Sequence, residues 1–408
     1  MNNSDFDIII VGGGIAGLYA AYKIKKISPN LRTCILEKQS KKYMGGRTGN
    51  DMFRGTNVVT GAGVGRKKKD KLLIELLNEM DIKTTEFEAG NSYATTISPP
   101  CDIKKMFLRI KQAYNASVKP QTFKEFATKI LGESEYKRFV VCSAYGDYEN
   151  ENIYDTLFNY GFDDNYNNWT GLYIPWHALI VKLVNEIGLQ NIKFKHGVES
   201  ISQHGENYRI HSKSGEFTCK KLVIATTIDT LLKLFPRGEP VYKQIKGQPF
   251  LRTYGKFSKS SCEIMKQYVP STTVVPGPLQ RIIPMNPDQG VYMIAYCDNA
   301  NALKLNKLSE DNEDSRSQFC KILETSLGIS SGSLKLLSIK NYFWPIGTHY
   351  YTPLSKEFDS REDFIKIAQK PDKNIRIVGE LISTNQGWVE GALESVNAVI
   401  TEKWIRDK

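Results

Sequence analysis

The first forty residues alternate between short apolar runs and one glycine-rich turn. Residues 6–11 are almost wholly apolar, which is typical of a strand buried on both faces of a parallel sheet. Residues 12–17 hold four glycines, and residues 18–27 carry apolar positions at helical spacing. Residues 33–36 are apolar again, and Glu37 follows them. This order predicts a strand, a tight turn, a helix and a second parallel strand.

The rest of the chain continues to mix helical and extended patterns. Apolar periodicity predicts helices over residues 69–80, 176–187, 314–327 and 388–404. Extended segments are predicted over residues 192–201, 208–212 and 216–225, through much of 240–300, and at 375–378. Residues 43–65 are rich in glycine, and residues 84–172 mix short signals of both kinds. We therefore predict an α/β protein without internal repeats.

A dinucleotide-binding pattern lies in the first unit. Gly12, Gly14 and Gly17 form GxGxxG between the predicted strand and helix, and an acid follows 20 residues after the last glycine. Gly12 permits the turn, Gly14 lets the backbone approach a pyrophosphate, and Gly17 lets the helix pack on the strand. A glycine-rich turn that binds nothing is the alternative. The predicted contacts of this unit are Gly12, Gly14, Ile15, Ala16, Gly17, Glu37 and Lys38.

Five further segments resemble parts of one flavoprotein family. Residues 45–47 read Gly-Gly-Arg, residues 61–64 read Gly-Ala-Gly-Val, and residues 375–392 end in Gly-Trp-Val-Glu-Gly-Ala. With the strands at 196–201 and 221–226, they resemble the flavin-containing amine oxidase superfamily, which includes monoamine and polyamine oxidases and lysine-specific histone demethylases. The resemblance implies non-covalent FAD held also by Gly46, Arg47, Gly61, Ala62, Gly63, Val64, Val198, Gly379, Glu380, Trp388 and Val389.

The resemblance also implies a role for each of these groups. Arg47 would help to hold the diphosphate, and residues 61–64 would run along the isoalloxazine ring and ribityl chain. Val198 would pair through its backbone with the adenine. Glu380 would meet the ribityl and diphosphate region. Trp388 and Val389 would lie beside the pyrimidine end of the flavin, at a helix N-terminus that suits a reduced flavin.

The substrate side departs from the family pattern. The segment at 342–353 resembles the one in which monoamine oxidases carry a flavin-linking cysteine, and Thr348 stands at that place. His349 and Trp388 would be the two cage positions that align the amine. Arg252 falls at or near the position of a family lysine that binds a water near flavin N5, with Lys256 as the other candidate. Predicted catalytic residues are Arg252, His349 and Trp388. No metal site is expected.

Composition and charge exclude several protein classes. Hydrophobic residues make up 41% of the 408, enough for a large core, so a mainly disordered chain is excluded. The net charge is +11, which leaves a nucleic-acid or anionic-surface binder as an alternative, although a lysine-rich surface is the favoured explanation. Seven scattered cysteines without CxxC argue for a reducing compartment and against a disulfide framework.

Location and source follow from the same reading. Residues 1–7 carry no secretory signal and the apolar stretch at 8–22 is too short and glycine-rich for a membrane span, so we expect a soluble cytoplasmic protein. The Lys-, Asn- and Ile-heavy usage is typical of AT-rich genomes, such as those of protists or large DNA viruses.

These observations predict a Rossmann-type FAD-binding domain with an interleaved α+β substrate domain. The FAD-binding domain would comprise residues 1–65, 173–240 and 354–408, and the substrate domain residues 66–172 and 241–353. The predicted function is oxidation of a primary amine or polyamine by O₂, which releases H₂O₂. Alternatives are a flavin-binding protein with little turnover, or an L-amino-acid oxidase, desaturase or sugar mutase on the same scaffold. Arg66 and Arg252 are candidates for the carboxylate-binding arginine that an amino-acid oxidase needs.

Overall fold

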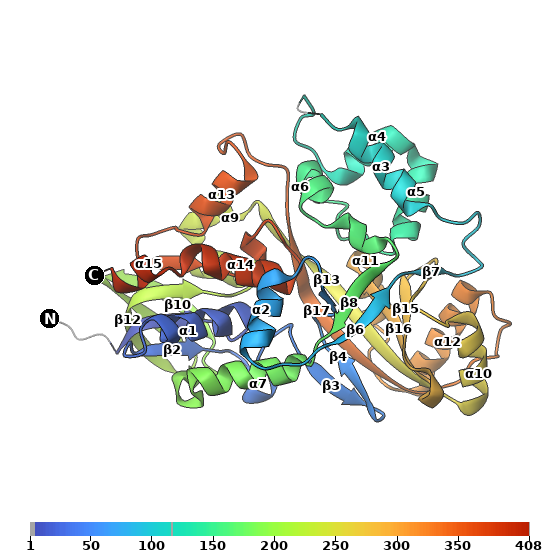
Figure 1. The fold of residues 1–408 in the computed structure, drawn as a ribbon, viewed down its shortest axis with the longest axis horizontal. Coiled ribbons are helices and arrows are strands. Elements are labelled where there is room, and N and C mark those ends of the chain that lie inside the picture. Colours follow the sequence, from blue (N-terminus) through green and yellow to red (C-terminus); the bar gives the residue numbers. More distant parts are fainter. Residues whose placement is uncertain (1–4, 116, 408) are drawn as a thin grey trace.

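The computed structural model describes residues 5–115 and 117–407. One half of the molecule is built on a seven-stranded sheet with helices on both faces (Figure 1). Its strands run in the order β10-β11-β12-β1-β2-β9, with β18 paired to β12. They are β1 (Phe6–Val11), β2 (Thr33–Leu36), β9 (Ile192–Lys193), β10 (Val198–His204), β11 (Asn207–Ser212), β12 (Gly215–Ile224) and β18 (Ile375–Ile377).

The centre of this sheet is parallel, because β1 pairs in parallel with β2 and with β12, and β12 pairs in parallel with β18. One face packs on α1 (Ile15–Ile27), α2 (Lys71–Glu79), α7 (Trp176–Ile187), α14 (Val389–Val399) and α15 (Glu402–Arg406). The other face packs on α8 (Ile228–Leu234), α9 (Glu239–Tyr242) and α13 (Arg361–Ala368). Strands from three separate parts of the chain meet here, and this arrangement confirms the predicted Rossmann-type fold class. The exact domain boundaries stay a prediction.

A second, six-stranded sheet forms the other half, in the order β17-β13-β16-β15-β14-β7. Its strands are β7 (Ser92–Tyr93), β13 (Ile245–Phe257), β14 (Thr273–Val274), β15 (Arg281–Asn286), β16 (Val291–Asp298) and β17 (Leu336–Tyr351). One face packs on α10 (Lys259–Tyr268), α11 (Asn299–Asn306) and α12 (Glu313–Leu327). The opposite face packs on the hairpin of β3 (Asn50–Phe53) and β4 (Thr56–Val59). A three-stranded sheet of β5 (Gly65–Arg66), β8 (Trp169–Tyr173) and β6 (Thr85–Ala89) lies between the two halves (Figure 1).

The region without a dominant sequence pattern contains a helical cluster, drawn at the upper right of Figure 1. It consists of α3 (Ile103–Ala113), α4 (Phe123–Leu131), α5 (Glu133–Ser143) and α6 (Ile153–Phe158). Stacked aromatic side chains fill its core; Phe107 and Phe162, for example, lie 4.1 Å apart between ring centroids.

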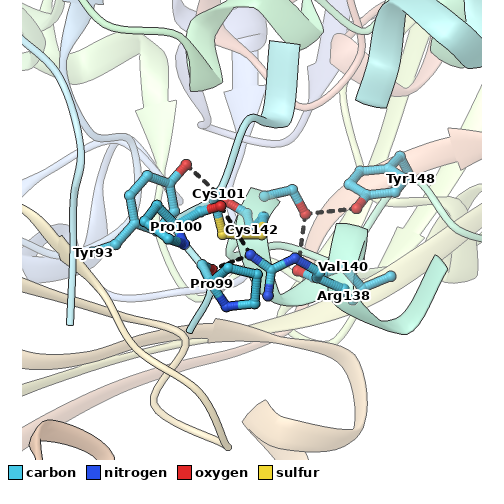
Figure 2. Close-up of a disulfide and its surroundings, with 9 residues drawn as sticks. Tyr93, Pro99, Pro100, Cys101, Arg138, Val140, Cys142 and Tyr148 are labelled. Atoms are coloured by element: carbon cyan, nitrogen blue, oxygen red, sulfur yellow. Dashed lines mark hydrogen bonds between the residues drawn. A yellow bond between two sulfur atoms is a disulfide. The ribbon is translucent and has the colours of Figure 1, made fainter. Parts of the chain in front are cut away.

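Two expectations need correction. The cysteines are not all free, because Cys101 and Cys142 form a disulfide that joins the segment before α3 to the end of α5 (Figure 2). The other five cysteines are free and buried. The argument for a reducing compartment therefore loses its basis. The final helix is also broken, because α14 ends at Val399 and Thr401 caps the N-terminus of a separate α15.

Candidate active site

The glycine turn at the start of α1 forms an open cradle. Gly12 has φ +107°, and a Cβ there would lie 2.3 Å from the Ala225 carbonyl oxygen. A Cβ on Gly17 would lie 2.0 Å from the Gly12 carbonyl oxygen, so both positions require glycine. A Cβ on Gly14, by contrast, would meet no atom within 4 Å.

Gly14 is also the N-cap of α1, and no side chain caps this helix end. The N–H groups that open the helix, which belong to Ile15 and Ala16, therefore lie beside open space. Gly46, with φ +61°, lies opposite, and a Cβ on it would be 3.6 Å from the Gly14 Cα. A diphosphate fits at an uncapped helix N-terminus that faces a cradle between two glycines. The residues present therefore suit the diphosphate of a dinucleotide such as FAD.

Glu37 ends β2 beside this cradle and is only 8% exposed. Its carboxylate accepts the Gly13 N–H at 2.7 Å and the Gln39 N–H at 2.7 Å. The His196 N–H donates to the Glu37 carbonyl at 2.9 Å, which brings Val198, at the start of β10, close to this strand end. Lys38 is exposed next to it. The structure thus gathers the residues predicted to hold the adenosine part of the cofactor.

Arg47 and Glu380 meet although they lie 333 positions apart in the chain. The Arg47 Nη1 donates to Glu380 Oε1 at 2.7 Å and to the Gly347 carbonyl at 2.9 Å, and the Gly387 N–H donates to Glu380 Oε2 at 2.9 Å. Burial alone would raise the pKa of Glu380, but the His349 ring and the Arg47 guanidinium hold that pKa well below its usual range. Glu380 is therefore a buried carboxylate that fixes the Arg47 side chain.

His349 is buried, and both nitrogens of its ring have hydrogen-bond partners. The residue is 2% exposed, and its Nε2 accepts the Ile228 N–H at 3.2 Å. The proton must therefore be on Nδ1, which donates to Glu380. Among the described residues, the ring makes no contact with the Trp388 ring. The structure thus engages His349 as a hydrogen-bonded support for Glu380. The two cage roles of His349 and Trp388 stay a prediction.

Trp388 is the N-cap residue of α14, next to the buried Val389. Its Nε1 donates to Asp70 Oδ2 at 2.8 Å, and the Arg66 guanidinium lies 4.6 Å from its ring centroid. Asp70 is fully buried and also pairs with Arg66 at 2.6 Å. One face of the indole ring is therefore already covered by the Arg66 guanidinium, in a cation–π contact. Gly379 precedes Glu380 with φ +127° and donates its N–H to the Ser395 Oγ at 2.8 Å.

The backbone between β4 and β5 is held in place by aromatic residues from the two halves. The Trp344 Nε1 donates to the Thr60 carbonyl at 2.7 Å, and the Trp176 Nε1 donates to the Gly63 carbonyl at 2.9 Å. The Ala62 N–H donates to the Arg47 carbonyl at 2.7 Å. A Cβ on Gly61 would lie 2.1 Å from that same carbonyl oxygen, so this close approach requires glycine. Residues 61–64 are each partly exposed, as a segment facing a ligand would be.

Arg252 lies on β13 next to this segment. Its Nη2 would be 3.4 Å from a Cβ on Gly63, and its guanidinium lies 3.9 Å from the Tyr296 ring centroid. Lys256, the other candidate for this position, instead binds the Gln289 carbonyl near the end of the strand. The structure therefore places Arg252, rather than Lys256, beside residues 61–64.

Sequence reasoning missed the residues that the helical cluster contributes to this region. Tyr145 packs edge-on against Tyr296 with ring centroids 5.4 Å apart. Asp147 and Glu151 line a small pocket together with Thr348 and Gly387. Burial raises the pKa of Asp147 to about 6. These residues lie in irregular segments without a linear motif, so only the packing of the cluster reveals them.

Within residues 5–115 and 117–407, no three or more His, Cys, Asp and Glu side chains are grouped to hold a metal ion. In that same part of the chain, each helix lacks the length or the apolar character that crossing a bilayer requires.

Comparison with known protein families places the chain. Residues 116–397 match the model of the flavin containing amine oxidoreductases. The chain belongs to this family. Residues 1–103 also match the Thi4 family model. The predicted family is confirmed, and membership implies a flavin cofactor and a small-molecule substrate.

Solved structures agree in fold. A wild-type putrescine oxidase bound to putrescine superposes with a TM-score of 0.75 at 14% identity, over 97% of this chain and 98% of that one. Cyclohexylamine oxidase from Brevibacterium oxydans gives 0.73 at 13% identity over the same shares. A putative protoporphyrinogen oxidase from Exiguobacterium gives 0.72 at 14% identity, over 99% of this chain and 100% of that one. At these identities the likeness shows the fold alone.

A curated sequence relative is similar over one short segment. The L-2-hydroxyglutarate dehydrogenase of Indibacter alkaliphilus is 49% identical over 37 residues, which is 9% of this chain and 9% of that protein.

Proposed function

We propose that the protein is an FAD-dependent amine oxidase. The observation that carries this proposal is the uncapped N-terminus of α1, which opens on the glycine cradle beside Arg47 and Glu380. The flavin that these residues would hold supplies the chemistry: a two-electron oxidation of the carbon next to the amine nitrogen, with O₂ as the final acceptor and an imine and H₂O₂ as products. Water then converts the imine to an aldehyde and a smaller amine or ammonia.

The chain's own residues would hold the cofactor in three places. The α1 N-terminus and Arg47 would bind the diphosphate, and Glu37 would accept hydrogen bonds from the ribose. Glu380 would keep Arg47 in position, because its buried carboxylate binds the guanidinium directly. Residues 61–64 would lie along the ring system, and the N-terminus of α14 at Val389 would face its pyrimidine end.

Non-covalent attachment is part of the proposal. Thr348 stands where a linking cysteine would be, and its hydroxyl accepts a hydrogen bond from the Gln248 Nε2 at 3.1 Å. A threonine hydroxyl is a far weaker nucleophile than a thiolate, so this position supports no cysteine-type link.

The remaining side chains would shape and dry the substrate site. Trp344 and Trp176 place apolar rings beside the segment at 60–63, and their indole N–H groups donate to the carbonyls of Thr60 and Gly63. Trp388 places its ring at the start of α14, where its N–H donates to Asp70. A water-poor aromatic wall favours a neutral amine over its ammonium form, which is the form that can lose a hydride. No described residue needs to act as a strong base in this scheme.

The direct test is anaerobic mixing of the purified holoprotein with a panel of amines. We expect loss of the visible absorbance of oxidised flavin with at least one amine, and its return with H₂O₂ when air is admitted. This measurement separates reduction from reoxidation. Failure of every amine to reduce the flavin would overturn the enzymatic proposal.

One observation favours a flavin-binding protein without turnover as the second candidate. Both predicted cage positions are already engaged, Trp388 by Arg66 and His349 by Glu380. In that case the protein would bind FAD tightly and remain oxidised with the whole amine panel.

A further inference from the structure

Arg252 is a deeply buried cation that forms no ion pair in the part of the chain that the structure describes. It is 5% exposed, as is Arg66, and Arg361 is 2% exposed. Arg66 pairs with Asp70 and Asp164, and Arg361 pairs with Asp155. Within residues 5–115 and 117–407, Arg252 forms no such ion pair. The sequence offered both Arg66 and Arg252 as ligands for a substrate carboxylate. Of these two, Arg66 is already paired with carboxylates of the protein, whereas Arg252 has no such partner among the described residues.

The contacts that Arg252 makes are with uncharged groups. Its Nη1 donates to the Met293 sulfur at 3.6 Å, and its plane lies over the Tyr296 ring. The Tyr254 hydroxyl is a further polar neighbour and itself donates to the Val59 carbonyl at 2.6 Å. A guanidinium stays charged at every physiological pH and offers five N–H donors in a planar fork. Burial of such a group without an anion is costly, so the site is built for one.

A second guanidinium lies at the other end of the same aromatic pair. Arg281 stacks on the Tyr145 ring at 4.2 Å and donates to its hydroxyl at 2.6 Å. Its Nε is buried and has no hydrogen-bond partner among the described residues. Because Tyr145 packs on Tyr296, the order through space is Arg252, Tyr296, Tyr145, Arg281. This unit presents two cations and a phenol hydroxyl from three different parts of the chain.

The unit is placed beside the proposed reaction site. Arg252 shares its sheet face with Tyr254 and Met293, which pack toward the β3–β4 hairpin. Its Nη2 approaches Gly63, in the segment proposed to line the flavin. An anion bound at Arg252 would therefore be a neighbour of the reacting carbon rather than of a distant surface.

Acidic neighbours do not cancel this positive charge. Asp147 is the carboxylate that most plainly interacts with Arg281, yet the two form no ion pair within the described residues. Asp147 accepts the Tyr160 hydroxyl at 2.6 Å instead.

We propose that Arg252, assisted by Arg281, binds a carboxylate of the substrate, so that the preferred substrate is an amine that carries a carboxylate, of the amino-acid type. This inference rests on the proposed amine oxidation and names its substrate class. A bidentate pair between the guanidinium and the carboxylate would fix the substrate's orientation at the flavin.

The first test measures binding without turnover. Benzoate is titrated into the oxidised holoprotein and followed by the change in flavin absorbance. We expect saturable binding in the wild type, a loss of about tenfold or more in affinity in Arg252→Gln, and a smaller loss in Arg281→Gln and in Arg252→Lys. Lys246→Gln is the matched control, because it removes an exposed charge from the same strand; its affinity should equal that of the wild type.

The second test compares matched substrates in anaerobic reduction: L-phenylalanine against phenethylamine, and L-leucine against isopentylamine. The amino acid of each pair should reduce the flavin faster in the wild type, and Arg252→Gln should abolish that preference. Faster reduction by the decarboxylated amines, or equal benzoate affinity in Arg252→Gln, would overturn the inference while amine oxidation stands. An altered flavin spectrum in Arg252→Gln with unchanged benzoate affinity would also overturn it, because the flavin would then be the partner of Arg252.

The two proposals fail in different ways. If no compound of either kind reduces the flavin, amine oxidation is wrong, whereas Arg252-dependent benzoate binding would still support the anion site. If Arg252→Gln does not retain flavin, the benzoate titration and the substrate comparison are made with Arg281→Gln and Arg252→Lys instead.

Discussion

Two glycines of the first turn lack a side chain for different reasons. Gly17 is needed by the fold, because its Cβ would overlap the Gly12 carbonyl, while Gly14 has free space around it. Gly14 has φ −73°, which any residue adopts. The proposed diphosphate would occupy this free space, so we expect the cofactor, rather than the fold, to require glycine at position 14.

Replacement of these glycines should separate binding from folding. We expect Gly14→Val to keep the melting temperature of the apoprotein and to weaken FAD binding by about tenfold or more, because its methyl groups fill the diphosphate cradle. Gly17→Ala, the matched control, should lower the melting temperature of the apoprotein through its clash. Apoprotein melting and FAD titration by fluorescence quenching measure both effects. Equal FAD affinity in Gly14→Val would show that the diphosphate lies elsewhere.

Glu380 should make the stability depend on pH in the acidic range. Its pKa is held below the value of about 4.3 that a free glutamate shows. The folded protein then binds fewer protons than the unfolded chain between the two pKa values. The stabilisation is complete above the unfolded pKa and is lost as the pH falls toward the folded pKa.

We therefore expect the difference in melting temperature between wild type and Glu380→Gln to be largest above about pH 5 and to shrink below about pH 4. Scanning fluorimetry across this range measures it, with the exposed Glu402→Gln as the control. A difference that stays constant with pH would show that Glu380 acts by packing alone.

At the scale of elements, one helix is capped by another. The Glu390 carboxylate, in the first turn of α14, accepts the Leu72 and Leu73 N–H groups at 2.8 and 2.9 Å. The N-cap of α2, Asp70, makes no cap bond with its side chain, which is occupied by Arg66 and Trp388. The carboxylate of α14 thus performs the capping that α2 lacks.

Glu390→Ala should cost about 1–2 kcal/mol of unfolding free energy, the usual effect of a lost cap. Glu75→Ala removes an exposed glutamate from α2 and should change the stability little. Urea denaturation of the apoprotein, followed by circular dichroism, measures both variants. Equal stability of Glu390→Ala and wild type would contradict the capping role.

The elements were predictable where the signal is local. The first strand, its glycine turn and α1 follow from apolar runs and turn chemistry within adjacent residues, and the structure has them at Phe6–Val11 and Ile15–Ile27. The helices of the cluster were not predictable, because their core depends on aromatic contacts between helices, such as Phe107 with Phe162. α10, inside a region predicted as strands and turns, was missed for the same reason, since its apolar face is defined by the second sheet.

At the scale of the whole molecule, the site depends on distant pairs. The family motifs named Arg47, Glu380 and Trp388, but no sequence pattern indicated that His349 would bind Glu380 or that Arg66 would cover Trp388. Tyr145 and Arg281 carry no motif at all and reach Tyr296 and Arg252 only through the packing of the helical cluster on the second sheet. The residues proposed to bind the cofactor could be named from motifs, whereas the residues that neutralise each other could not.

The disulfide also joins parts of the chain that are distant in sequence, because its two cysteines lie 41 positions apart. It ties Cys142, at the end of α5, to Cys101, and the next residue, Ser143, shares a hydrogen bond of 2.6 Å with the Tyr148 hydroxyl (Figure 2). Arg281 also reaches the Ser143 carbonyl, at 3.5 Å. The disulfide therefore anchors the chain three residues before Tyr145, and we expect it to help to hold this side of the proposed anion site in place.

The proposed cofactor would connect segments that are far apart in the chain. Its diphosphate would touch the α1 turn and Arg47, its adenosine end Glu37 and Val198, and its ring system the segment at 61–64 and the start of α14. A ligand that binds only the assembled site stabilises the folded state by mass action, by about 2.7 kcal/mol at a hundredfold excess over its dissociation constant. The melting temperature should therefore rise with added FAD, while added NAD, which has the same adenosine diphosphate part, should raise it less.

Because Thr348 offers no thiolate, heating or acid should also release the flavin into solution as the protein precipitates. Flavin fluorescence in the supernatant measures the released fraction, and we expect nearly all of the bound flavin there. Flavin that stays with the precipitate would reveal a covalent link through another residue, and the melting temperature should then be independent of added FAD. The two measurements must agree, because only a cofactor that leaves the unfolded chain can shift the folding equilibrium through its free concentration.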